Sequence, residues 1–160
     1  MARLIPNENT WVGFKASIAD TATLVPTAAE CAAATNLTGF LISLNAASQG
    51  NTVPTPAFDT LFETSISGTN QASFTADFYR DDSTDTAWTT LDRATTGYFV
   101  ISRFGGSGTD NLPAAADTVE VWPVTITSRT MQNMSNNTVM TFSVTCSVPQ
   151  EPNENATVTA

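Results

Sequence analysis

The chain has 160 residues, of which 41% are hydrophobic and only 13% are charged. Its 15 acidic residues against 6 basic ones give a formal net charge of −9. A protein that grips nucleic acid or an anionic membrane surface needs clustered cations, so this composition argues against both kinds of binding. The chain has no histidine, which removes the commonest general base and the usual catalytic zinc ligand.

The first half of the chain begins with an arm and a strand. Residues 1–10 show no periodicity and are predicted to be an N-terminal arm. Apolar residues alternate over 11–18, which predicts a strand. Thr27, three residues before Glu30, fits a capping box at the start of one or two helical turns. Residues 37–44 are a second candidate strand.

The middle of the chain contains its longest turn-rich stretch, residues 45–57, which is predicted to be a loop. A loop of this length without structure of its own is usually functional or disordered. Residues 62–68 and 74–80 each alternate, and Gly68-Thr69-Asn70 separates them. This pattern predicts a β-hairpin.

An acidic loop then precedes a predicted helix over residues 86–92; its carboxylates belong to Asp81, Asp82 and Asp85. Carboxylates at this place complement the positive end of a helix. A calcium loop is the alternative interpretation, although the alternating ligand order and the terminal Glu of such loops are missing. Trp88 and Leu91 are three residues apart, so both are expected to face the core, with Trp88 largely buried.

Two β-rich runs follow over residues 98–104 and 118–128, and the Gly-rich segment between them is expected to be a flexible loop. In the second run the apolar face shifts beside Pro123, which predicts a bulge or an edge because proline cannot donate to a strand ladder. Residues 139–148 alternate regularly and predict another strand. Residues 149–160 are predicted to be a flexible C-terminal tail.

The search for catalytic chemistry finds little. Cys31 and Cys146 are interpreted as two buried small hydrophobic residues, with a disulfide left open because sequence gives no Cα distances. A pair of carboxylates could serve a glycosidase, and Glu63, Asp77 and Glu120 lie at outward positions of predicted strands. Such positions are typical of a solvated face, so no catalytic residue, metal ligand or cofactor site is predicted.

Six segments in fixed order carry a resemblance to a known family. They are residues 26–30 (Pro-Thr-Ala-Ala-Glu), 36–38 (Asn-Leu-Thr), the strand 74–80, 85–91 (Asp-Thr-Ala-Trp-Thr-Thr-Leu), 97–103 (Gly-Tyr-Phe-Val-Ile-Ser-Arg) and 117–124 (Asp-Thr-Val-Glu-Val-Trp-Pro-Val). Together they resemble the major tail (tail tube) proteins of long non-contractile-tailed bacteriophages, closest to those infecting actinobacteria. The resemblance covers about residues 11–148.

The resemblance implies a mainly β fold: a β-sandwich, barrel-like tail tube domain over residues 11–148 with one short flanking α-helix. It further implies hexameric rings of identical copies, stacked into a hollow tube through which DNA passes during ejection without specific binding. Other tail proteins, such as the tape measure and the tail terminator, would be its partners. The protein would belong to the virion tail, assembled in the bacterial host cytoplasm, with no membrane, cofactor or enzymatic role.

Two sets of residues are candidates for this role. Alternation along the strands suggests a lumen lined by small polar or acidic side chains, namely Glu63, Ser65, Ser67, Thr75, Asp77 and Glu120. A like-charged wall would not hold DNA by its phosphates. The 45–57 segment and the N-terminal arm are expected to contact neighbouring subunits, with ring-stacking candidates at Asn45, Gln49, Asn51 and Thr52.

Two other classes of protein remain as alternatives. A monomeric β-sandwich binding module, such as a carbohydrate-binding or adhesin-like domain, would present exposed aromatic side chains on one sheet face. Trp11 and Tyr79 are the outward candidates for that role. A hydrolase is the second alternative, and it would require two of the strand carboxylates to meet.

Overall fold

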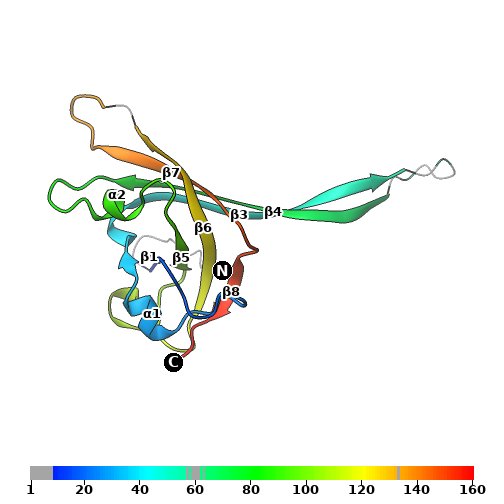
Figure 1. Cartoon of the computed structure of the whole chain (residues 1–160), viewed down its shortest axis with the longest axis horizontal. Coiled ribbons are helices and arrows are strands. Elements are labelled where there is room, and N and C mark those ends of the chain that lie inside the picture. The colour runs from blue at the N-terminus through cyan, green and yellow to red at the C-terminus, as the bar shows by residue number, and fades with distance from the viewer. Residues whose placement is uncertain (1–8, 57, 59–61, 63, 133) are drawn as a thin grey trace, which may run out of the picture.

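The computed structural model describes residues 9–56, 58, 62, 64–132 and 134–160. In this part of the chain one antiparallel sheet has the strand order β2-β1-β5-β6-β7-β4-β3, and β8 pairs with β6 (Figure 1). Its strands are β1 (Trp11–Lys15), β2 (Thr35–Asn36), β3 (Leu41–Thr55), β4 (Thr64–Tyr79), β5 (Thr96–Ser102), β6 (Thr118–Met131), β7 (Thr141–Ser147) and β8 (Asn153–Thr157). The short helices are α1 (Ala28–Ala32) and α2 (Thr86–Thr90), with 3-10 turns η1 (Thr38–Phe40) and η2 (Thr109–Asn111). The expected mainly β fold is confirmed.

The sheet folds over itself, so its two halves enclose the larger core. Phe74 of β4 stacks on Phe99 of β5, with ring centroids 4.6 Å apart. These two strands are separated by β6 and β7 in the sheet, so their side chains meet only because the sheet curls. Trp122 of β6 also lies against the ring of Phe74, with 5.9 Å between the ring centroids. One continuous sheet therefore supplies both layers of the predicted sandwich.

β6 is buried on both faces because side chains alternate along a strand. Trp122 and Val124 face the larger core, whereas Val119 and Val121 face a second cluster that includes Trp11 and residues of α1 and β8. The shift of the apolar face that the sequence indicates is therefore real. It marks the passage of one strand between two cores.

Pro123 does not produce the predicted bulge. It pairs with Tyr98 in an uninterrupted β5–β6 ladder, and the register shifts of β6 lie elsewhere. On the other side of β6, pairing with β8 reaches Val121 and pairing with β7 begins at Thr125. Pro123 thus lies at a local edge of β6, opposite the gap between two partner strands, where a missing N–H donor removes no ladder hydrogen bond. Of the predicted bulge or edge, the edge is the one found.

The predicted loop over residues 45–57 is wrong. β3 runs through it and pairs with β4 from Leu41 opposite Phe78 to Thr55 opposite Thr64. The predicted hairpin of 62–68 with 74–80 is also wrong, because both segments belong to the single strand β4. The outer parts of both strands, residues 48–55 and 64–71, project from the body as a two-stranded ribbon, here called the arm (Figure 1).

The expected flexible C-terminal tail is instead part of the fold. β8 pairs with β6, and Ala156 and Val158 are buried in the second cluster. The amide of Thr159 donates to the carbonyl of Pro26 (3.0 Å), and Ala28 donates to the carbonyl of Thr159 (2.8 Å). The C-terminus therefore fixes the start of α1. The predicted N-terminal arm, residues 1–10, is a different segment from the β3–β4 ribbon, and its residues 1–8 lie outside the described residues.

The Gly-rich segment before β6 is held in place by a carboxylate. Asp117 Oδ2 accepts hydrogen bonds from the amide of Ser107 (2.7 Å), its hydroxyl (3.0 Å) and the amide of Ala114 (2.8 Å). These bonds hold the pKa of Asp117 below its usual value. The backbone amides of Ala114 and Ser107 are the largest causes of this lowering. The segment is a loop, as expected, and these hydrogen bonds connect it to the start of β6.

The capping box at α1 is confirmed: the amide of Glu30 donates to Thr27 Oγ1 (3.2 Å), and the amide of Thr27 donates to Glu30 Oε2 (2.9 Å). At α2 the expectation is only partly right. Leu91 is fully buried, whereas Trp88 is half-buried and carries the guanidinium groups of Arg80 and Arg129 over its ring, 4.3 and 3.6 Å from the centroid.

The acidic loop before α2 does not cap the helix. The carboxylate of Asp85 forms an ion pair with Arg80, and Asp85 itself has a left-handed backbone conformation. The loop therefore ties α2 back to the end of β4. It uses a charge pair where the sequence suggested a favourable interaction with the helix dipole.

The two cysteines are free and buried, as interpreted from the sequence. Cys146 lies in the larger core and Cys31 in the second cluster. Burial raises the pKa of Cys31 to about 11 and that of Cys146 to about 12. Both thiols therefore stay protonated near neutral pH and act as small hydrophobic groups.

Phe74→Ala should lower the free energy of unfolding by about 3–5 kcal/mol, because it empties the space between Phe99 and Trp122. Phe104→Ala is the matched control: its ring is 77% exposed, and a loss below about 0.5 kcal/mol is expected. Denaturant unfolding of the two variants measures both values. Equal losses would contradict the placement of Phe74 in the core.

Candidate functional site

One layer of the sheet has a buried face and a polar face. It consists of β3 up to residue 47, β4 from residue 73, β7 and the second half of β6, and is here called the outer leaf. In β4, Phe74 and Phe78 point into the core. The opposite face is here called the polar face. Its side chains are Ser43, Asn45, Ala47, Ser73, Thr75, Asp77, Tyr79, Thr125, Ser128, Thr130, Thr141, Ser143, Thr145 and Ser147.

Asp77 is the only charged side chain of that set, and it sits in a hydrogen-bonded row. Ser43 Oγ of β3 donates to Asp77 Oδ2 (2.6 Å), and Ser143 Oγ of β7 donates to Oδ1. Gln132, just after β6, donates to Ser143 Oγ (2.5 Å). The hydroxyl of Ser143, followed by that of Ser43, lowers the pKa of Asp77. The row therefore crosses the whole outer leaf and keeps one carboxylate ionised on it.

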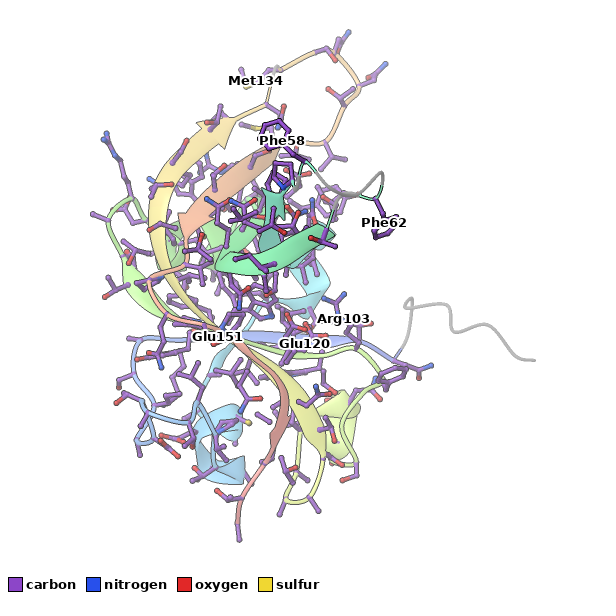
Figure 2. The ribbon with its side chains drawn as sticks, turned by 90° about the vertical axis from the view of Figure 1, so that its right-hand side faces the viewer. Phe58, Phe62, Arg103, Glu120, Met134 and Glu151 are labelled. Carbon is purple, nitrogen blue, oxygen red and sulfur yellow. The ribbon has the colours of Figure 1, made fainter. Side chains whose placement is uncertain are left out.

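The predicted lumen residues do not form one surface. Thr75 and Asp77 lie on the polar face, whereas Ser65 and Ser67 lie on the exposed arm. Glu120 lies in the first half of β6, outside the outer leaf, where it forms an ion pair with Arg103; Figure 2 labels both side chains. Glu63 lies outside the described residues.

Glu120 was expected to point outward, and that expectation is wrong. Its side chain is on the same side of β6 as Trp122, and it accepts a hydrogen bond from the Trp122 indole Nε1 (3.2 Å). Arg103 Nη2 donates to the same oxygen, Oε2, at 3.0 Å, and Arg103 Nε donates to Oε1. Ser43 and Ser143 were not among the predicted lumen residues. For Ser143 the alternation over residues 139–148 does indicate an outward position.

The ring-stacking candidates lie along β3. Asn45 is on the outer leaf, opposite Thr75, whereas Gln49, Asn51 and Thr52 are on the arm. The arm is exposed on both faces, and a register shift interrupts its pairing between Gly50 and Thr52.

Large apolar side chains are exposed on the arm. Val53 faces Ile66 across its two strands, and both are about half exposed. Phe58 and Phe62 lie at the tip with highly exposed rings (Figure 2). Exposed apolar groups in such a concentration are typical of an interaction surface.

The outer leaf has two open edges among the described residues. β3 is the last strand of the sheet on one side. On the other side, pairing of β5 with β6 ends at Thr125, so β6 continues past it with one edge uncovered. Uncovered strand edges are templates for pairing with another chain.

The alternative classes find little support in the described residues. Asp77 and Glu120 lie in different parts of the molecule, so they do not form the close carboxylate pair of a glycosidase. No group of three or more His, Cys, Asp or Glu is placed to hold a metal there. Trp11 is buried, which leaves Tyr79 alone as an outward aromatic candidate. Among the helices of the described chain, none has the length and apolar character to cross a membrane.

Replacing Asp77 should change how the free energy of unfolding depends on pH. Its folded-state pKa is lowered, so its contribution is present above the ordinary Asp pKa of about 4 and is lost as pH falls through the folded-state value. The free energy of unfolding of Asp77→Asn should therefore fall less steeply than that of the wild type below about pH 4. Denaturant titrations at several pH values measure the slope. Ser43→Ala/Ser143→Ala should reproduce it, and identical slopes in all three proteins would refute the row.

Comparison with known proteins shows which family and which solved structures this chain resembles. The family model described as "Phage tail tube protein" matches residues 1–160. No curated protein matches the chain. Three solved structures have the same fold, each with a TM-score of 0.57. A chain of the native gene transfer agent (GTA) virion is 11% identical, with 92% of this chain and 96% of that chain covered.

The other two structures are also assemblies. A chain of the empty GTA particle's tail, refined with C6 helical symmetry, is 12% identical and covers 97% of this chain and 100% of that one. A chain of the six-fold symmetrised baseplate of the anti-feeding prophage (AFP) is 10% identical, with 96% of both chains covered. At these identities the likeness establishes the fold. The family match over the whole chain shows that the protein belongs to the phage tail tube protein family and is a structural component of the virion tail.

Proposed function

We propose that this protein self-assembles into rings of six copies that stack into the hollow tail tube, and that DNA passes through the tube during ejection. The observation that carries the proposal is the outer leaf, which has two open edges and one polar face. The six-fold number comes from the C6 symmetry of the GTA tail and the six-fold AFP baseplate.

The direction of the strands supports closure of a ring. Neighbouring strands of the outer leaf are antiparallel, so β6 at one end and β3 at the other run in opposite directions. If β3 of one copy lies beside β6 of the next, the contact is again antiparallel and the sheet continues around the ring. A head-to-tail contact of this kind closes when the rotation between copies closes.

The polar face is proposed to line the lumen. Its other face is packed on the core, so this one must meet water. Its side chains are small and uncharged apart from Asp77, which is charged, and Tyr79, which is large. Duplex DNA carries one charge per about 1.7 Å of axis, and each cation on the wall would add an attractive contact. A wall with hydroxyls and one carboxylate from each copy lets the duplex slide.

The arm is proposed to reach the neighbouring ring. A two-stranded ribbon exposed on both faces is marginally stable by itself in water, and packing against another layer stabilises it. The stacking candidates Gln49, Asn51 and Thr52 lie on this ribbon, as do Ser65 and Ser67, which we now assign to stacking and not to the lumen.

Further partners and the place of assembly rest on the sequence resemblance. We propose the tape measure and tail terminator proteins as partners, and the cytoplasm of the bacterial host, an actinobacterium, as the place of assembly. The sequence resemblance also predicts a domain over residues 11–148. We propose that this domain extends further and includes β8.

Negative-stain electron microscopy of the purified protein at high concentration tests the proposed function. Hollow tubes with six-fold end views are expected. Monomers at every concentration, or solid fibres without a channel, would overturn it.

Shortening the arm should abolish stacking but not folding. Deletion of residues 51–69 joins Gly50 to Asn70, which already pair, and leaves a two-residue turn of a favoured type between Gln49 and Gln71. The protomer should unfold at nearly the wild-type temperature because the strand residues that the deletion removes, 51–55 and 64–69, lie outside both cores. Sedimentation should find single rings and no tubes. Tubes of normal length would show that the arm has another role.

Reversing the charge of the polar face should slow ejection. Asp77→Lys presents cations to the DNA from every ring, so particles with this variant should have intact tails but release their DNA more slowly when triggered in vitro. Asp82→Lys, outside the polar face, makes the same charge change and should leave the release rate unaltered. Wild-type release from the Asp77→Lys particles would count against the lumen assignment.

A further inference from the structure

The turn between α2 and β5 is held by hydrogen bonds and an ion pair, and it presents an arginine. Ala94 has a left-handed backbone conformation (φ 67°), which is strained for a residue with a side chain. Its amide donates to the carbonyl of Ile126 (2.9 Å), and the amide of Ile126 donates to the carbonyl of Thr95 (2.9 Å). Asp92 is bound to Arg129 (2.9 Å) and accepts from the Arg93 amide (2.7 Å). Strain that is held this firmly suggests a functional constraint.

The guanidinium of Arg93 differs from the other arginines of the described chain. Arg80, Arg103 and Arg129 each form an ion pair with a carboxylate of the same protomer. The Arg93 side chain is exposed, and no ion pair within the described residues holds it. The turn therefore offers a positive charge to another molecule.

A groove at the base of the arm offers the opposite charge. It has a volume of about 580 Å³, and its lining includes Leu24, Ser48, Gln150, Glu151, Asn153 and Glu154 but no Lys or Arg. Gln150 and Asn153 are occupied, since their amides donate to the carbonyls of Thr21 (3.1 Å) and Thr23 (2.8 Å).

The two glutamates of the groove are not equivalent. The hydrogen bond to Glu120 is the main cause of the raised pKa of Arg103, and the nearby charge of Glu154 adds to it. Glu151 is exposed and forms no ion pair in the described chain. Figure 2, which looks toward the side from which the arm projects, shows Glu151 there.

The pairing register places the turn and the groove at matching levels on the two open edges of the outer leaf. Ala46, Phe74, Cys146 and Ile126 form one row across β3, β4, β7 and β6. The turn is bound to Ile126 at one end of this row. Ser48, in the groove, is two residues beyond Ala46 at the other end. When the β6 edge of one copy joins the β3 edge of the next with their rows at the same height, the turn of the first copy comes next to the arm base of the second.

We propose that Arg93 of one copy binds Glu151 in the groove of the adjacent copy, as a charged contact between neighbouring subunits of the ring. The occupant of the groove is thus a second copy of this chain. The inference rests on the proposed ring and adds the residues that set which edges meet. Charge complementarity of this kind contributes more to the specificity of an interface than to its total affinity.

Charge reversal on each side tests the contact. R93E and E151R each place like charges at every subunit interface, so each should raise the concentration needed for tube assembly by about five- to tenfold at low salt. The double variant R93E/E151R should assemble within about twofold of wild type. An equimolar mixture of the two single variants should also assemble, because alternation around a six-membered ring puts opposite charges at every interface.

D82R is the control for E151R, since it makes the same charge change outside the groove and should assemble like wild type. Protomers of all variants should unfold at the wild-type temperature, and salt at 1 M should shrink the differences. Single variants that assemble like wild type, or a double variant and a mixture that are not rescued, would overturn the contact while leaving the ring proposal intact. Wild-type protein that forms no rings would overturn the proposed function and the contact with it.

Discussion

The alternation of side chains along β6 is the constraint on which the rest of the structure depends. Val119 and Val121 on one side and Trp122 and Val124 on the other anchor this strand in two cores at once. The strand is thereby fixed so firmly that its second half can extend beyond β5 and carry an outer leaf with one wet face. The open edges, the polar face and the arm all belong to the layer that this extension carries.

The chain uses its few cations mainly inside the protomer. Arg80 and Arg129 lie over the ring of Trp88 and bind the carboxylates before and after α2, and Arg103 binds Glu120. These pairs fasten the short helix and the strand ends, which have little core of their own. They also neutralise positive charge on the protomer, and Asp77 is the charged side chain of the polar face.

The strands with one buried face could be predicted from the sequence, because β5, β6 and β7 keep a strict two-residue period or a clear apolar run. The β3 side of the arm could not, because it buries neither face and has no hydrophobic period, and Gly50 and Pro54 mimic a loop. The β4 side alternates over residues 64–68 and is predicted to be a strand, but with the wrong partner. Asp77 was placed correctly by alternation. Glu120 was misplaced because β6 has a core on each side, so no face of its first half is an outward one.

A cryo-electron microscopy map of the assembled tube, at a resolution that traces strands, tests the central claim most directly. The account predicts a channel lined by the polar face, with the Asp77 carboxylates pointing inward and β3 of each copy running antiparallel beside β6 of the next. A channel lined by α1 and β8, or by the ion-paired arginines, with the outer leaf on the outside of the tube, would contradict it.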